Sequence, residues 1–126
     1  MREPARPPQH VLVVEDDAAA RGLIAEVARR EGLEVREAAD GLAGLSELAQ
    51  PPLPAAIILD LEMPVMHGMD FLSELRKVPE ASAIPVILVT AHAAVPGLEA
   101  LGVAAILPKP MSIAHLASVL RGLVGS

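Results

Sequence analysis

The sequence predicts an α/β protein with a doubly wound, five-stranded parallel sheet and five helices, the fourth of them short. Four short apolar runs are continuous rather than alternating, which is typical of strands that helices cover on both faces. Amphipathic segments with helical periodicity separate these runs. Strand and helix therefore alternate along the chain, and right-handed crossovers place helices on both sides of the sheet.

The expected strands are short, and four of them are almost purely apolar. A fifth segment alternates apolar and charged residues, which favours a place at the edge of the sheet. In chain order, we expect strands at 11–14, 33–38 (the alternating one), 55–59, 85–89 and 103–107.

Residues that start or stop helices delimit the segments between the strands. Gly32 is placed to end the first helix, and Asp40 and Ser112 are placed to cap the second and the last. Pro96 and Gly97 leave room for only one or two turns in the fourth. The apolar stripes of the other four helices are Ala20, Leu23, Ile24 and Val27; Leu42, Leu45 and Leu48; Phe71, Leu72, Leu75 and Val78; and Ile113, Leu116, Leu120 and Leu123.

Composition limits the class of protein. With 126 residues, 52% of them hydrophobic, and a mean hydropathy of +0.46, the chain can bury one domain core. We expect a flexible proline-rich tail at 1–9 and one domain at 10–126. The net charge of −6 and the single Phe argue against direct nucleic-acid binding. The apolar runs are too short to span a membrane, and the absence of cysteine fits the cytoplasm.

Polar residues follow the apolar runs where parallel strands reach one edge of a sheet. The acidic residues 15–17 follow the first run, and Asp60, Thr90 and Lys109 follow the next three. Functional groups of doubly wound sheets gather at these carboxyl ends. We therefore expect a cluster of carboxylates, a hydroxyl and an ammonium group.

Such a cluster favours a divalent cation. Two carboxylates about 4 Å apart repel by roughly 4 kcal/mol at an effective dielectric near 20, and Mg²⁺ prefers oxygen ligands. Asp16 and Asp60 suit the carboxylate positions, and the backbone carbonyl of Glu62 could add a third oxygen. Asp60 could then attack phosphorus, while Lys109 neutralises the transferring group. Asp17 is equally suited to capping the first helix.

Four segments together resemble the signature of the response-regulator receiver family. They are VLVVEDD at 11–17, IILDLEMP at 57–64 with Gly68, VTA at 89–91 and LPKP at 107–110. The resemblance extends over roughly residues 11–123. It fits the strand order 2-1-3-4-5 that flavodoxin-like sheets share.

The resemblance implies a role for each site residue. Asp16 would bind Mg²⁺ directly and Glu15 through water, Asp60 would be the phosphoacceptor, Thr90 the switch hydroxyl and Lys109 the phosphate-binding lysine. It also implies a cis bond between Lys109 and the proline after it. The expected partners are a sensor histidine kinase or phosphotransfer protein and an unknown downstream protein. The expected chain is a monomer or weak homodimer, and it is not a conventional enzyme.

The sequence departs from the family at the output side. Ile106 stands where members often carry Tyr or Phe, and the stretch between Thr90 and Lys109 is a few residues shorter than usual. An aliphatic side chain cannot follow Thr90 as an aromatic one does, so we expect a different output. Glu62 and His92 occupy two positions that tune phosphate lifetime in the family.

The sequence leaves three alternative functions open. A degenerate receiver would keep the fold and bind proteins without phosphorylation. A phosphatase of the haloacid dehalogenase type would need a second aspartate where this chain has Glu62. A flavodoxin-like flavin binder would need aromatic residues to stack on the flavin and a phosphate-binding loop, and the chain has neither Trp nor Tyr.

Overall fold

Five parallel strands form one sheet in the order β2-β1-β3-β4-β5, as predicted. The structure is a computed structural model that describes residues 9–62, 68–94 and 96–124. The strands are β1 (His10–Val14), β2 (Glu34–Ala38), β3 (Ala56–Asp60), β4 (Val86–Thr90) and β5 (Ala105–Pro108). The alternating segment is the edge strand β2.

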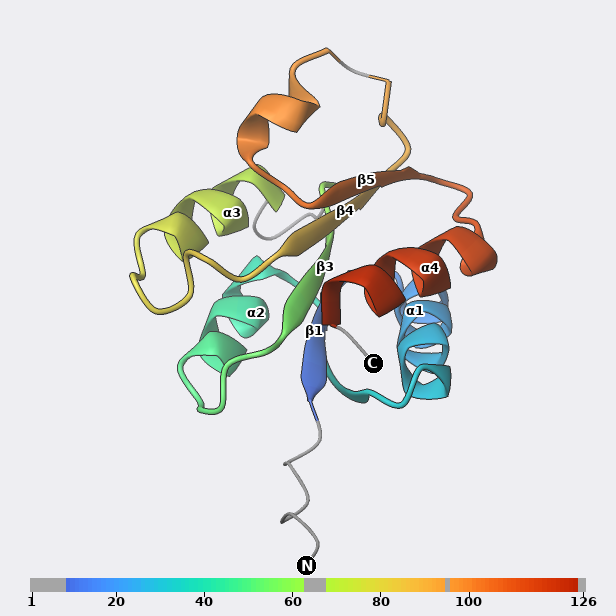
Figure 1. Ribbon diagram of the computed structural model, residues 1–126. Coiled ribbons are helices and arrows are strands. Elements are labelled where there is room, and N and C mark those ends of the chain that lie inside the picture. Colours follow the sequence, from blue (N-terminus) through green and yellow to red (C-terminus); the bar gives the residue numbers. More distant parts are fainter. Residues whose placement is uncertain (1–8, 63–67, 95, 125–126) are drawn as a thin grey trace, which may run out of the picture.

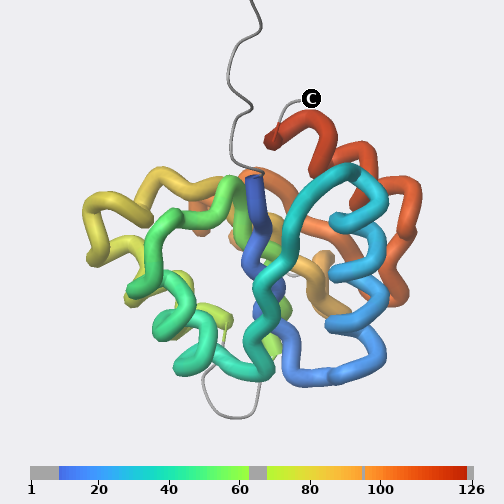
Figure 2. The backbone as a smooth tube through the Cα atoms, turned by 90° about the horizontal axis from the view of Figure 1, so that it is seen from below, coloured from blue at the N-terminus to red at the C-terminus, as the bar shows by residue number. Residues whose placement is uncertain are grey.

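Helices cover both faces of the sheet. Figures 1 and 2 show α1 and α4 on one side of the strands, and α2 and α3 on the other. This arrangement confirms the doubly wound fold. The helices are α1 (Ala18–Arg30), α2 (Gly41–Leu48), α3 (Gly68–Arg76) and α4 (Ile113–Val124).

Each strand divides its apolar side chains between two cores. In β1, Val11 and Val13 belong to the core under α1 and α4, whereas Leu12 and Val14 belong to the core under α2 and α3. The continuous apolar runs follow from this division, because successive side chains of a strand point to opposite faces and both faces are covered. Phe71 of α3 is fully buried in the second core.

The expected helix boundaries are confirmed at three positions. The Asp40 side chain accepts a hydrogen bond from the Ala43 N–H at 2.8 Å, and the Ser112 hydroxyl accepts one from the His115 N–H at 3.2 Å. Gly32 follows α1 with a φ of +83°, a left-handed conformation that suits glycine.

Four of the five expected helices are α-helices in the described part of the chain, and the short fourth is not one. Among the described residues between β4 and β5, the helical segment is a single 3₁₀ turn, η1 (Leu98–Leu101). Gly97 and Gly102 flank this turn with φ values of +90° and +72°. Because left-handed residues on both sides interrupt the helical backbone, the segment does not extend into an α-helix.

Four of the stripe residues are more exposed than expected. Ile113, predicted on the buried face of the last helix, is 48% exposed, and Leu42 is 55% exposed. Each lies in the first turn of its helix. Val78 (39%) lies beyond the end of α3, and Leu23 (41%) lies at the border of the α1 stripe.

The expected tail at 1–9 falls almost entirely outside the described residues, and β1 begins at His10. Among the helices that the structure describes, none combines the length and the apolar character that crossing a membrane requires.

Candidate functional site

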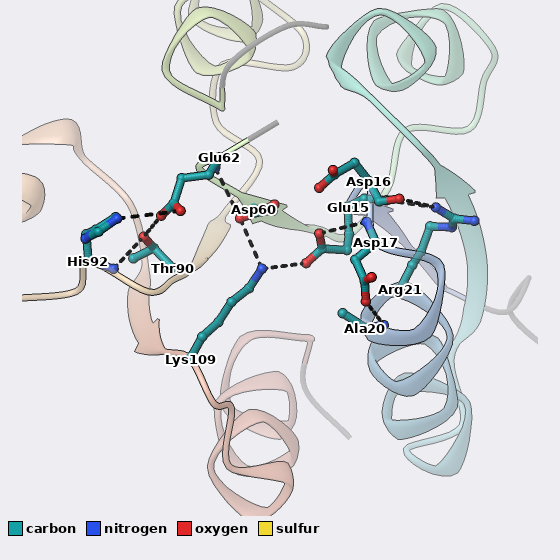
Figure 3. A network of polar contacts seen from close by, with 10 residues as sticks. All are labelled: Glu15, Asp16, Asp17, Ala20, Arg21, Asp60, Glu62, Thr90, His92 and Lys109. Carbon is teal, nitrogen blue, oxygen red and sulfur yellow. Dashed lines mark hydrogen bonds and ion pairs between the residues drawn. The ribbon is translucent and has the colours of Figure 1, made fainter. Parts of the chain in front are cut away.

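The ends of four parallel strands bring the predicted polar residues together, as Figure 3 shows. Asp60 and Thr90 are the last residues of β3 and β4. Glu15 follows β1 directly, and Lys109 follows β5. Glu15, Asp60 and Thr90 are all buried, at 1%, 3% and 0% exposure. The site is therefore built at one edge of the sheet, on strands that the core holds in place.

Lys109 joins the two buried carboxylates. Its Nζ atom lies 3.0 Å from Glu15 Oε1 and 3.3 Å from Asp60 Oδ1. The Lys109 backbone N–H also donates to the Thr90 carbonyl at 2.9 Å, which fixes the lysine beside the tip of β4. One ammonium group thus forms ion pairs with both carboxylates.

The electrostatics of the site follow from burial. Burial raises the pKa of Glu15 to about 7, the hydrogen bond from Lys109 opposes this shift, and the neighbouring Asp60 adds to it. Burial alone would lower the pKa of Lys109, but the hydrogen bond with Glu15 and the charge of Asp60 raise it above its usual value. Lys109 therefore remains a cation at neutral pH.

Three carboxylates form a possible metal centre. Oxygen atoms of Glu15, Asp16 and Asp60 lie within 4.8 Å of one another. Two of these residues are buried, whereas Asp16 is exposed and faces the solvent side of the site. An all-oxygen, acidic donor set that is open to water fits Mg²⁺, which keeps several water ligands.

Backbone and lysine donors surround one oxygen of Asp60. Oδ1 accepts a hydrogen bond from the Glu62 N–H at 3.1 Å and contacts Lys109. The role of the Glu62 backbone carbonyl as a metal ligand stays a prediction.

Asp17 is a helix cap. Its side chain accepts a hydrogen bond from the Ala20 N–H at 2.8 Å at the start of α1. Of the two roles open to Asp17 in the sequence, the structure shows capping.

The Thr90 hydroxyl hydrogen-bonds to the Glu62 side chain rather than to Glu15, Asp16 or Asp60. Thr90 Oγ1 lies 2.9 Å from Glu62 Oε1, and it accepts a hydrogen bond from the His92 N–H at 3.0 Å. His92 Nε2 lies 3.6 Å from Glu62 Oε2. The sequence pointed to positions 62 and 92 separately, but not to this contact between them and the threonine.

Arg21 is a site residue that sequence reasoning missed. Its guanidinium donates to the carbonyl of Glu15 at 2.9 Å and, more weakly, to that of Asp16 at 3.5 Å. It also pairs with Glu37 on β2 at 3.3 Å. Arg21 thus ties the acidic loop to the edge strand. The only sign of this role in the sequence is that an arginine stands one turn into the helix that follows the acidic loop.

Two further expectations have different outcomes. The bond between Lys109 and Pro110 is cis, as predicted. The last two residues of the IILDLEMP segment, 63 and 64, lie outside the described residues.

The family model for the response regulator receiver domain matches residues 11–121. The transcriptional regulatory protein PdtaR of Mycobacterium tuberculosis is 38% identical over 113 residues, which are 86% of this chain and 53% of PdtaR. The chain spans about half the length of several such curated relatives.

Two solved structures superpose on most of this chain. The chemotaxis protein CheY4 of Vibrio cholerae superposes with a TM-score of 0.84 at 27% identity, over 93% of this chain and 99% of CheY4. The receiver domain of sensor histidine kinase PA1611 from Pseudomonas aeruginosa gives a TM-score of 0.84 at 28% identity, over 95% and 100% of the two chains. That structure has a magnesium ion coordinated in its active site cleft.

Proposed function

The chain belongs to the response regulator receiver domain family of two-component systems, and from this we propose that Asp60 accepts a phosphoryl group from a histidine kinase or a phosphotransfer protein. The observation that carries the proposal is the position of the Lys109 ammonium group, 3.3 Å from Asp60 Oδ1 and 3.0 Å from Glu15 Oε1. A lysine in this place can neutralise charge on a phosphoryl group that arrives at Asp60.

Phosphoryl transfer to Asp60 forms one bond and breaks one. The oxygen of Asp60 attacks phosphorus, the bond between phosphorus and the donor's imidazole nitrogen breaks, and that nitrogen keeps the electron pair. Lys109 remains beside the new oxygens and offsets their charge. The Thr90 hydroxyl, fully buried at the tip of β4, then donates a hydrogen bond to one of them.

Mg²⁺ is the cofactor that we propose, held by Asp16, Asp60 and the Glu62 carbonyl, with Glu15 contacting it through water. The three carboxylates support this assignment because their oxygens lie within 4.8 Å. When bound, the ion would offset the charge of the carboxylates and of the phosphoryl oxygens. The magnesium reported in the PA1611 receiver domain supports the same choice.

Receiver domains interact with histidine kinases and phosphotransfer proteins, and they are not generally conventional enzymes. A phosphorylation-independent binding module is not favoured. We propose a cytoplasmic protein, monomeric or weakly dimeric, whose phosphorylation changes a surface that an unidentified downstream protein reads. The receiver domain would span residues 10–126.

The test is phosphorylation by a small donor. Purified protein is incubated with acetyl phosphate and Mg²⁺ and run on a phosphate-affinity gel. We expect a retarded band for the wild type and none for Asp60→Asn or after chelation of Mg²⁺. Asp70→Asn is the matched control, because Asp70 is an exposed carboxylate on α3. A wild type that is not retarded, or a retarded Asp60→Asn variant, would show that the proposal is wrong.

A further inference from the structure

We propose that the Glu62 carboxylate holds the Thr90 hydroxyl away from the phosphoryl site, so that phosphorylation of Asp60 has to displace Glu62. Glu62 is then a positioning residue that acts through Thr90. This inference rests on the proposed phosphorylation of Asp60.

The hydrogen bonds of Thr90 determine where its single hydroxyl proton points. A carboxylate can only accept, so in the 2.9 Å contact between Thr90 Oγ1 and Glu62 Oε1 the hydroxyl is the donor. The His92 N–H donates to the same Oγ1 at 3.0 Å, which occupies a lone pair and leaves the proton directed at Glu62. Both bonds together fix the direction in which the hydroxyl points.

A phosphoryl group at Asp60 would compete for that proton. Its oxygens, like those of Glu62, are acceptors, and a hydroxyl has one O–H to donate. Thr90 can therefore bind Glu62 or the phosphoryl group, but not both with the same hydrogen bond. Each time the switch operates, the contact between Thr90 and Glu62 must break.

The released carboxylate has a neighbour on the surface. Glu62 Oε2 already lies 3.6 Å from His92 Nε2, and the two side chains are 47% and 67% exposed. Figure 3 shows the glutamate carboxylate beside both the threonine and the histidine. Movement of Thr90 is thereby passed to an exposed polar pair, formed by Glu62 after β3 and His92 after β4. Ile106, which stands where family members often carry Tyr or Phe, is a partly buried residue of the core under α2 and α3.

The test is a double-mutant cycle on Glu62 and Thr90. Binding of beryllofluoride, a phosphoryl mimic, in the presence of Mg²⁺ is measured by NMR titration of the full chain. We expect Glu62→Ala to bind beryllofluoride about tenfold more tightly, because the hydroxyl no longer has to give up a charged acceptor. In the Thr90→Ala background, adding Glu62→Ala should change the affinity less than twofold, because the hydroxyl proton for which Glu62 and the phosphoryl mimic compete is absent.

Two control variants separate the hydrogen bond from charge and from general effects. Glu62→Gln keeps an acceptor oxygen and removes the charge, so its gain should be smaller than that of Glu62→Ala. Glu80→Ala removes an equal charge from an exposed position in the loop before β4, at the end of that strand opposite Thr90. It should bind like the wild type.

A readout without phosphoryl mimic or metal tests the contact itself. The amide resonance of His92 reports on Thr90, because its N–H donates to Thr90 Oγ1. It should shift in Glu62→Ala and stay in place in Glu80→Ala.

Three outcomes would overturn the inference: no gain in Glu62→Ala, an equal gain in the Thr90→Ala background, or an unmoved His92 amide. Failure of the wild type to bind beryllofluoride would instead overturn the proposed function, and the inference with it. The metal-free His92 comparison would still report whether Glu62 binds Thr90.

Discussion

The ammonium group of Lys109 lies 3.0 Å from the carboxylate of Glu15, a residue 94 positions earlier in the chain. Glu15 is 1% exposed, and Asp60, whose Oδ1 lies 3.3 Å from the same ammonium group, is 3% exposed. Two buried carboxylates side by side are costly unless a cation compensates them. Lys109 therefore stabilises the fold as well as the site.

Lys109→Ala should lower the free energy of unfolding by about 1–3 kcal/mol near pH 8, because it leaves the buried carboxylate of Glu15 without this partner. Urea unfolding measures the loss. Lys77→Ala is the matched control, since Lys77 is 66% exposed and its pair with Glu74 lies on the surface. It should cost less than about 0.5 kcal/mol. Equal losses in the two variants would contradict a stabilising role for the buried pair.

Stability without divalent cations should depend on pH through Glu15. Its folded-state pKa is raised from 4.5 to about 7, so between these values the folded protein holds this proton more tightly than the unfolded chain. The contribution of Glu15 is full below pH 4.5 and is lost as the pH rises through 7. To test this, the unfolding free energies of the wild type and Glu15→Gln are measured without divalent cations between pH 4.5 and 8. The wild type should lose stability relative to the variant as the pH rises, and a constant difference would refute the shift.

The sheet and the gathering of the site residues were predictable because they depend on local patterns and on topology. A continuous apolar run predicts a covered strand whatever its partners are, and parallel strands bring their ends to one edge. The prediction that Asp60, Thr90 and Lys109 meet needed no side-chain geometry. Capping by Asp40 and Ser112 is also local, since each cap and its amide are three residues apart.

Contacts between side chains far apart in sequence were not predictable. The bond between Thr90 and Glu62 spans 28 positions, and the one between Arg21 and Glu37 spans 16. Both depend on the rotamers of long side chains, which no periodicity encodes. The exposure of Ile113 was missed for a related reason: a helical stripe shows which residues share a face, but not where the covering sheet ends.

Asp17 and Asp16 are adjacent acids with different roles, and substitutions should separate them. Asp17→Ala should lower the free energy of unfolding by about 1 kcal/mol through loss of the cap on α1, whereas Asp17→Ser keeps a capping oxygen and should remain within about 0.5 kcal/mol of the wild type. Calorimetric titration with Mg²⁺ should show binding to Asp17→Ser and loss of binding in Asp16→Ser. Loss of binding in both serine variants would make Asp17 a ligand as well.

Gly44 and Gly22 are helix glycines with different surroundings. A Cβ on Gly44 would lie 2.8 Å from the Phe71 ring, so Gly44→Ala should lower the free energy of unfolding by about 1 kcal/mol as the ring gives way. Gly22, on the exposed face of α1, has nothing within 4 Å of such a Cβ. Gly22→Ala should raise the free energy of unfolding by about 0.5–1 kcal/mol through helix propensity. Urea unfolding of both variants checks the order, and a destabilised Gly22→Ala would contradict it.

Gly68 packs closely against the backbone of Asp60, the proposed phosphoacceptor. A Cβ there would lie 2.6 Å from the carbonyl oxygen of Asp60 and 2.7 Å from the Cα of Leu61. These are backbone atoms that cannot rotate away, and the Gly68 N–H already binds the Leu61 carbonyl at 2.9 Å. Gly68→Ala must therefore move α3 or the end of β3. We expect a loss of about 3 kcal/mol, at the upper end of overpacking, together with slower labelling by acetyl phosphate, because Asp60 moves with its strand. Gly22→Ala should be labelled at the wild-type rate, and an equally fast Gly68→Ala would show that the close approach does not position Asp60.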